Sequence, residues 1–208
     1  MSAPTDAPNQ HESAQARSAR ALAAALADYR ACWPGEAAVV DTFIALLGDD
    51  VDPFVRERLA GHFTASAWLV AGDRRRVLLT HHRKLERWLQ LGGHADGDRD
   101  LARAALKEAE EESGLHGLTL VPGLFDLDRH WIPVHKGVPA HWHYDVRYVV
   151  RAGEDETFVV SDESHALAWR DIAALVDDTG ADPSLRRMAR KWLAGEAPAA
   201  DCKALPLL

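Results

Sequence analysis

The segment from Gly92 to Leu115, GGHADGDRDLARAALKEAEEESGL, constrains the fold of this chain more than any other part of it. It begins with a glycine pair directly after RWLQL, a short apolar run that is typical of a strand. Ala, Leu and Glu dominate the residues from Asp100 to Ser113, and a glycine follows at Gly114. This composition predicts a helix that ends at Gly114. A strand, a glycine turn and a helix are therefore expected in direct succession.

Three glutamates of the predicted helix share one face. Glu108 lies one helical turn before both Glu111 and Glu112, while Glu110 points elsewhere. Like charges placed this way destabilise an isolated helix by about 0.2–0.5 kcal/mol per pair. Composition alone favours a solvated acidic face. The alternative is a divalent-cation site, because Mg²⁺ prefers carboxylate oxygens together with substrate phosphates. The glycines that frame the helix favour this alternative.

The whole segment resembles the signature box of the Nudix hydrolases. That box reads Gly, five residues, Glu, seven residues, Arg-Glu, an aliphatic residue, any residue, Glu-Glu, any residue, Gly and an aliphatic residue. Gly93 opens it here, and its second half is filled by Lys107, Glu108, Ala109, Glu111, Glu112, Gly114 and Leu115. Two positions depart from the pattern, because Arg99 stands at the first glutamate and Lys107 at the arginine. These two residues are structural partners in the family, so their ion pair cannot form here. Asp98 and Asp100 are the candidate partners of Lys107 instead.

The resemblance implies a fold and an activity. The fold is a Nudix-like α/β/α sandwich with a mixed β-sheet. The activity is that of a pyrophosphohydrolase acting on a nucleoside diphosphate derivative, such as a nucleotide or a nucleotide sugar. The resemblance also implies a Mg²⁺ cofactor, with Mn²⁺ as the alternative, held at Glu108, Glu111, Glu112 and Gly92. The glycine there lets the backbone approach the metal closely.

Catalytic residues are also implied by the resemblance. Glu111 and Glu108 are candidates on the helix, and Glu163 is a third candidate further along the chain. Glu163 lies six residues before Trp169, and many family members carry a further metal ligand or the catalytic base at that spacing. A carboxylate that the metal does not fully occupy, Glu111 or Glu163, is expected to take the proton of the attacking water.

The charge of the chain limits the partners that it can bind. A net charge of −8 argues against a general binder of nucleic acid or of anionic membranes. A small phosphorylated substrate is expected instead, and it needs local positive charge. Arg83, Lys84 and Arg87 lie just before the box and are candidates for contacts with its distal phosphates. Trp88 can stack on a nucleobase, although core packing is the first assumption for it.

Histidines gather near the box. His94 follows the glycine pair, and HWHYD places His141, His143 and Asp145 on one face of a strand. Two imidazoles and a carboxylate can ligate a transition metal. The favoured interpretation is hydrogen bonding or base recognition, because alternating polar residues also mark an ordinary open strand face. His94, His143 and Asp145 are therefore candidate substrate contacts, and no metal is expected on these histidines with Mg²⁺ alone.

Two other functions compete with hydrolysis. The departures at Arg99 and Lys107 fit a Nudix-fold binding or regulatory module without turnover, but the three intact glutamates argue against it. The Gly-His pair is also similar to isopentenyl diphosphate isomerase, which shares the fold. That family places a catalytic cysteine where this chain has Gly92, so isomerase chemistry is disfavoured.

The chain around the box divides into a helical part and a mixed part. The expected divisions are a flexible N-terminus at 1–15, an N-terminal helical extension at 16–61 and a Nudix domain at 62–200. Helices are predicted at 16–32 and 36–47, with a third in DPFVRERLA, residues 52–60. The Ala-rich first helix is the first candidate for a homodimer contact.

Strands alternate with turns in the rest of the sequence. They are predicted at 63–72 and 77–82 as a hairpin, and then at 87–93, 118–134, 141–152 and 165–171. Helices are predicted at 171–177 and 183–194. No apolar run reaches the roughly 18 residues of a membrane helix, and the two cysteines, Cys32 and Cys202, form no disulfide framework. We therefore expect a cytoplasmic protein with no membrane partner.

Overall fold

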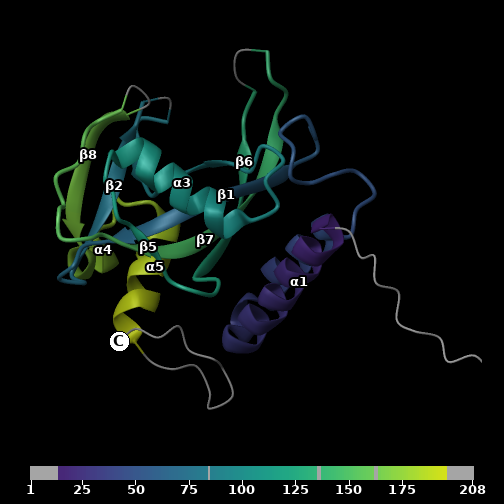
Figure 1. Cartoon of the computed structure of the whole chain (residues 1–208), viewed down its shortest axis with the longest axis horizontal. Helices are drawn as coiled ribbons and strands as arrows, with labels where there is room; N and C mark the ends of the chain where they lie inside the picture. The colour runs from purple at the N-terminus through teal and green to yellow at the C-terminus, as the bar shows by residue number, and fades with distance from the viewer. Residues whose placement is uncertain (1–13, 84, 135–136, 162–163, 196–208) are drawn as a thin grey trace, which may run out of the picture.

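A single mixed sheet forms the centre of the molecule. The computed structural model describes residues 14–83, 85–134, 137–161 and 164–195 of the 208-residue chain (Figure 1). The sheet has the strand order β3-β2-β1-β7-β5, and β4 pairs with β1, β6 with β7 and β8 with β2. The strands are β1 (His62–Val70), β2 (Arg76–His82), β3 (Arg87–Leu89), β4 (Leu91–His94), β5 (Thr119–Leu120), β6 (Asp126–Ile132), β7 (His141–Arg151) and β8 (Ser164–Asp171).

Strand β1 is the central strand of the sheet. It pairs with β7 in parallel along its whole length, from His62 beside His143 to Val70 beside Arg151. On its other edge it meets β2 at Val70 and β4 along its first half, both antiparallel. The predicted hairpin of β1 and β2 is confirmed. The long parallel pairing with β7 could not be predicted from local pattern, and it brings two histidine-bearing strand ends together.

The helices agree with the sequence except in one segment. They are α1 (Ala14–Cys32), α2 (Ala37–Leu47), α3 (Leu101–Ser113), α4 (Ile172–Asp177) and α5 (Pro183–Ala194), with a 3-10 turn at Pro34–Glu36. The third N-terminal helix expected at 52–60 is wrong, because this segment consists of turns. Pro53 and the Asp52 side chain, which accepts a hydrogen bond from the backbone N–H of Phe54 at 3.0 Å, favour a turn here.

Helices cover both faces of the sheet. Alternate residues of β1 point to opposite sides. Ala67 and Leu69 face α3, which lies across the front of the strands in Figure 1. Trp68 and Val70 face the other side and pack with α4 and α5. The molecule is therefore the expected α/β/α sandwich with a mixed sheet.

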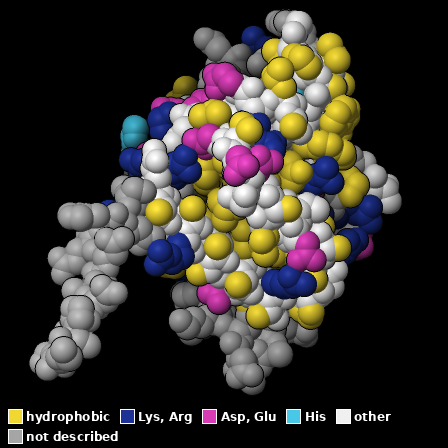
Figure 2. Space-filling view, turned by 90° about the vertical axis from the view of Figure 1, so that its right-hand side faces the viewer, with side chains coloured by type: hydrophobic (Ala, Val, Ile, Leu, Met, Phe, Trp, Pro, Cys, Tyr) yellow, Lys and Arg dark blue, Asp and Glu magenta, His cyan; other side chains and the backbone are white. Residues whose placement is uncertain are grey.

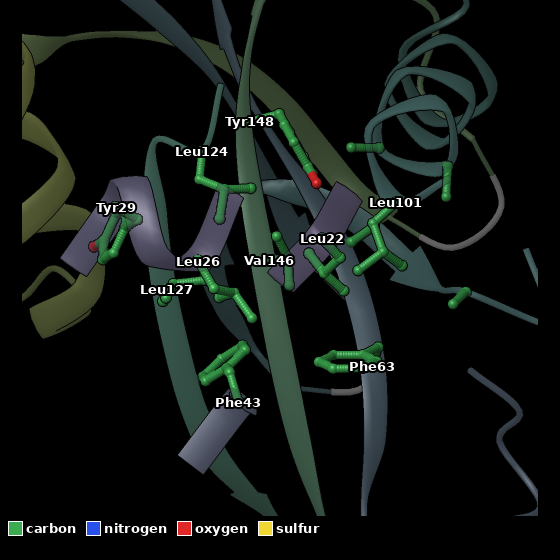
Figure 3. Close-up of a cluster of buried hydrophobic side chains, with 14 of the residues drawn as sticks. Leu22, Leu26, Tyr29, Phe43, Phe63, Leu101, Leu124, Leu127, Val146 and Tyr148 are labelled. Atoms are coloured by element: carbon green, nitrogen blue, oxygen red, sulfur yellow. The ribbon is translucent and has the colours of Figure 1, made fainter. Parts of the chain in front are cut away.

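The N-terminal helices pack against the α3 side of the sheet. Leu22 and Leu26 of α1 and Phe43 of α2 point toward Phe63 and Val146 on the strands (Figure 3). Leu26 and Phe43 are completely buried. Burying one such side chain stabilises the fold by about 1.5–3 kcal/mol. The N-terminal helical extension thus shares a core with the sheet.

The surface carries a mixture of charges. On the face in Figure 2, Lys and Arg side chains are scattered among Asp and Glu, and hydrophobic side chains gather at the top, at the level of the β6–β7 hairpin. Trp131, Val134 and Val138 of this hairpin region are exposed. Among the described residues no helix combines the length and the apolar character that a membrane span requires. Cys32 is not a free thiol, and Cys202 lies outside the described residues.

Candidate functional site

Helix α3 is fixed at both ends by its own sequence. The side chain of Asp100 caps the first turn by accepting a hydrogen bond from the backbone N–H of Arg103 at 3.0 Å. Gly114 ends the helix in the left-handed conformation, with φ 67°, which glycine adopts without steric cost. Leu101, Ala105 and Ala109 bury one face against the sheet. The glutamates therefore lie on a helix whose position and rotation are set.

Two of the glutamates lie directly against the glycine pair of β4. The backbone N–H of Gly92 donates a hydrogen bond to Glu112 Oε1 at 3.0 Å. The Glu108 carboxylate occupies the space beside Gly93, where an added Cβ would lie only 2.6 Å from its Cδ and Oε1. Any side chain at Gly93 would displace this carboxylate. The two glycines thus form the wall against which Glu108 and Glu112 are held.

Glu111 occupies the exposed side of the same helix face. Lys107 Nζ lies 3.1 Å from Glu111 Oε2, one turn earlier. Such a solvent-exposed pair contributes little, so the lysine does not hold Glu111 firmly. The carboxylates of Glu108, Glu111 and Glu112 are oxygen donors of the kind that Mg²⁺ prefers, and all three lie on one side of α3 beside β4.

Arg99 has a different partner from the one that its place in the box implies. Its guanidinium forms an ion pair with Asp52 and lies over the ring of Phe54, with Cζ 4.8 Å from the ring centroid. Both partners belong to the turn segment that precedes β1. The loop before α3 is therefore braced by the end of the N-terminal extension.

The partner expected for Lys107 needs a correction. Asp98 pairs with Arg103 at 2.8 Å, and Asp100 caps α3. Lys107 itself pairs with Glu111. The aspartates are drawn to the first turn of the helix, where its unpaired backbone N–H groups and the positive end of its dipole favour carboxylates.

The basic candidates lie around the β2–β3 turn. The exposed Arg83 donates a hydrogen bond to the Ser164 carbonyl at 3.2 Å, and Arg87 pairs with Asp182 at 3.1 Å. A cavity of about 390 Å³ opens beside this turn, lined by Leu79, His81, Glu86, Arg87, Trp88, Arg170, Leu175, Asp178, Gly180, Ala181, Asp182, Pro183 and Leu185. Trp88 is half-buried and presents its ring to Arg170, with Cζ 5.7 Å from the centroid. Lys84 and Glu163 lie outside the described residues.

Asp145 is not available to a substrate. It is buried, and its carboxylate accepts hydrogen bonds from Ser66 at 2.8 Å, Thr64 at 3.0 Å and Gln90 at 3.1 Å. Arg147 completes the set through its Nε at 2.7 Å. The alternation of HWHYD does place Asp145 on the same side of β7 as His143, but this face is covered there. The expected contact of Asp145 with substrate is therefore wrong, because this carboxylate is buried and already accepts hydrogen bonds from four side chains.

A buried ionic network continues from Arg147 to both ends of the described chain. Asp126 is fully buried and forms three ion pairs. The N–O distances are 3.1 Å to Arg147, 2.6 Å to Arg187 and 2.7 Å to Lys191. Lys191 also donates to the hydroxyl of Tyr29 in α1. Burial raises the pKa of Asp126, but the hydrogen bond from Arg187 and the nearby cations outweigh it and lower the pKa overall. The network links α1, β6, β7 and α5. No motif in the sequence predicts it.

Five histidines converge at one end of the sheet. His62 begins β1, His94 ends β4, His141 and His143 begin β7, and His130 lies on β6. Ring centroids of His62 and His143, and of His94 and His143, are 5.0 Å apart, and those of His62 and His94 are 5.2 Å apart. Burial lowers the pKa of His94 to about 4 and that of His143 to about 2, and it also lowers the pKa of His62. These three imidazoles are uncharged at neutral pH.

His62 was missed as a site residue. It lies outside the box and outside HWHYD, and nothing near it in sequence suggests a site. The signal that could have found it is long-range, namely that the first residue of the first strand and the histidine-bearing strand are neighbours in the sheet.

Comparison with known proteins agrees with this architecture. The model of the NUDIX domain matches residues 61–192. A comparison with curated proteins finds no match. Among solved structures, the chain is similar to a hydrolase of the NUDIX family from Clostridium perfringens, with 28% identity and a TM-score of 0.50 over 64% of this chain and 95% of that one.

Two further solved structures match the chain at lower identity. A C. elegans Ap4A hydrolase is 16% identical, with a TM-score of 0.49 over 64% of this chain and 95% of that chain. The E. coli dihydroneopterin triphosphate pyrophosphohydrolase is 19% identical, with a TM-score of 0.49 over 64% of this chain and 96% of that one. The residues matched by the NUDIX domain model, 61–192, include β4 and α3.

Proposed function

Because the chain belongs to the Nudix family, we propose that it is a divalent-metal-dependent hydrolase that cleaves a pyrophosphate bond in a nucleoside diphosphate derivative. The observation that carries this proposal is the glycine wall of β4, against which Glu108 and Glu112 are held. The similar hydrolase from Clostridium perfringens supports the same class of reaction. We also propose that the Nudix domain comprises residues 62–200 and that residues 16–61 form a helical extension in front of it.

Glu108, Glu111 and Glu112 would hold Mg²⁺, or Mn²⁺ in its place, beside the Gly92 backbone. When bound, such an ion neutralises the charge of a phosphate oxygen and lowers the pKa of a coordinated water. Glu111 is our candidate for the group that takes the water proton, since it is exposed and its pair with Lys107 is weak. Glu163 is the alternative.

The substrate would lie between the glycine wall and the β2–β3 turn. Arg83 and Arg87 supply positive charge at this turn for the phosphates, with Lys84 beside them in sequence. The cavity lined by Trp88 and Arg170 lies on the α4–α5 side of the sheet, whereas Glu108 lies against Gly93 on the α3 side. We therefore do not assign this cavity to the substrate that is cleaved at the glycine wall.

A substrate panel tests this function. Nucleotides, nucleotide sugars and dinucleoside polyphosphates are incubated with the full-length protein in Mg²⁺, in Mn²⁺ or in EDTA, and released phosphate and nucleotides are measured. We expect cleavage of at least one class that requires the metal and stops in EDTA. Tight binding of a nucleotide without cleavage anywhere in the panel would favour a binding module instead, and double-bond migration in a prenyl diphosphate would favour an isomerase.

A further inference from the structure

Three strands bring three histidines to one point at the end of the sheet. His62 of β1 is the register partner of His143 of β7, and His94 of β4 is the partner of Thr64, two residues after His62. One nitrogen from each of the three rings lies within 4.8 Å of the other two. Because all three come from paired strands, the sheet itself holds their backbones in place. Sites built on strands are positioned more precisely than sites built on loops.

His62 has a nitrogen with no partner. The residue is 2% exposed, and within the described part of the chain its Nε2 has no hydrogen-bond partner although it is buried. Leaving a buried polar atom unsatisfied costs about 1–3 kcal/mol. Its other nitrogen, Nδ1, lies 3.3 Å from the Arg58 carbonyl oxygen and donates its proton there. Nε2 is then the unprotonated nitrogen, and its lone pair is available to a ligand.

The neighbouring contacts resemble those around metal-bound imidazoles. Ligating histidines usually donate their second N–H to a carbonyl or carboxylate, which fixes the orientation of the ring. The bond from His62 to Arg58 is of this kind, and His141 Nδ1 donates in the same way to the Pro139 carbonyl at 2.8 Å. His141 Nε2 in turn lies 3.1 Å from His143 Nε2. His141 Nε2 therefore accepts a hydrogen bond from His143 Nε2, so His141 is a neighbour of the three histidines and not a member of their group.

We propose that His62, His94 and His143 form a binding site for a first-row transition-metal dication such as Zn²⁺. Imidazole nitrogens suit Zn²⁺, Cu²⁺, Ni²⁺ and Fe²⁺, whereas Mg²⁺ takes oxygen ligands. Three histidines would leave one position of a tetrahedral ion for water or another ligand. The site is separate from the carboxylates of α3, because consecutive residues of a strand point to opposite faces and His94 directly follows Gly93.

Metal titration of the full-length protein tests this site without any substrate. After treatment with a chelator, Zn²⁺ binding is followed by calorimetry and Co²⁺ binding by its visible d–d absorption. We expect one equivalent of Zn²⁺ to bind, and affinity to fall at least about 100-fold in both His94→Ala and His143→Ala, since loss of an outer contact alone costs about 10–100-fold. Circular dichroism and thermal melting confirm that each variant is folded, and His94→Gln replaces His94→Ala if the latter is not.

The controls separate this site from two others. His165→Ala removes a member of the exposed group of His81, Glu86 and His165, and Glu112→Gln alters the carboxylate site. Both should bind Zn²⁺ within about twofold of the unsubstituted protein. Zn²⁺ binding that is lost in His165→Ala or Glu112→Gln but kept in His94→Ala would overturn the proposal. So would the absence of Zn²⁺ and Co²⁺ binding at millimolar metal.

Discussion

Replacing Gly93 with alanine crowds the Glu108 carboxylate, whose three atoms lie nearest to the added Cβ. The new Cβ would lie 2.6 Å from Glu108 Cδ and Oε1 and 2.7 Å from its Oε2. Non-bonded carbon atoms rest at about 3.5–4.0 Å, so the carboxylate must withdraw by about 1 Å. The crowded atoms are the end of a flexible side chain, and the backbone of β4 can therefore stay in place.

The size of the effect follows from the demands of the metal. Mg²⁺ holds its ligands at about 2.0–2.1 Å in a nearly octahedral arrangement, so a withdrawal of about 1 Å removes Glu108 from coordination. Misplacing a catalytic group by about this distance costs roughly 100-fold in rate, which corresponds to about 2.7 kcal/mol. We expect kcat/KM of Gly93→Ala to fall about 100-fold at low Mg²⁺, with partial recovery at high Mg²⁺.

The assay is hydrolysis of the best substrate across a Mg²⁺ titration, with thermal melting of each protein. Gly35→Ala is the matched control, because an alanine Cβ at Gly35 would meet nothing within 4 Å. Both variants should keep the free energy of unfolding to within about 1 kcal/mol. If folded Gly93→Ala kept the unsubstituted Mg²⁺ dependence and rate, Glu108 would not be a metal ligand and the reasoning would fail.

Three further predictions concern stability. Leu26→Ala should lower the free energy of unfolding by about 2–5 kcal/mol, because Leu26 of α1 is fully buried between this helix and the sheet. A decrease in melting temperature of less than about 2 °C would contradict this packing. Burial raises the pKa of Asp128, but the hydrogen bond with His130 and the nearby arginines outweigh it, so the folded pKa lies below the unfolded one. Asp128 then adds stability above about pH 4 that is lost on acidification, and Asp128→Asn should flatten the fall of the urea midpoint between about pH 5 and pH 2; an unchanged slope would refute this. A double-mutant cycle of Asp52→Ala and Arg99→Ala should give a coupling of about 0.5–1 kcal/mol, whereas strictly additive effects would show that the brace is absent.

Local signals in the sequence were sufficient for α3 and for the elements around it. Asp100 and Gly114 mark the ends of this helix through capping chemistry that acts within a few residues. The spacing of Glu108, Glu111 and Glu112 put them on one face for the same local reason. The glycine pair was predicted to be a turn, and this is wrong because Gly92 and Gly93 lie within β4. The space beside Gly93 is filled by the Glu108 carboxylate, which comes from a different element.

Long-range pairing was beyond the same signals. Arg99 pairs with Asp52, which lies in a segment predicted to be helical. That segment is a turn because Pro53 and the Asp52 side chain stabilise a turn there. The parallel register of β1 and β7 places His62 beside His143, and no local periodicity reports a register between distant strands. Asp145 looked like an open-face residue because alternation shows which side of a strand a residue is on, but not what covers that side.

Glutamine replacement on α3 tests the central claim most directly. Glu111→Gln and Glu112→Gln each keep the size and hydrogen-bonding shape of the side chain but remove its charge. We predict that each lowers Mg²⁺-dependent kcat/KM on the best substrate by at least about 100-fold, near the effect of losing one group that stabilises charge in the transition state, with an unchanged melting temperature. Turnover at the unsubstituted rate in both variants would contradict the assignment of this helix as the metal site.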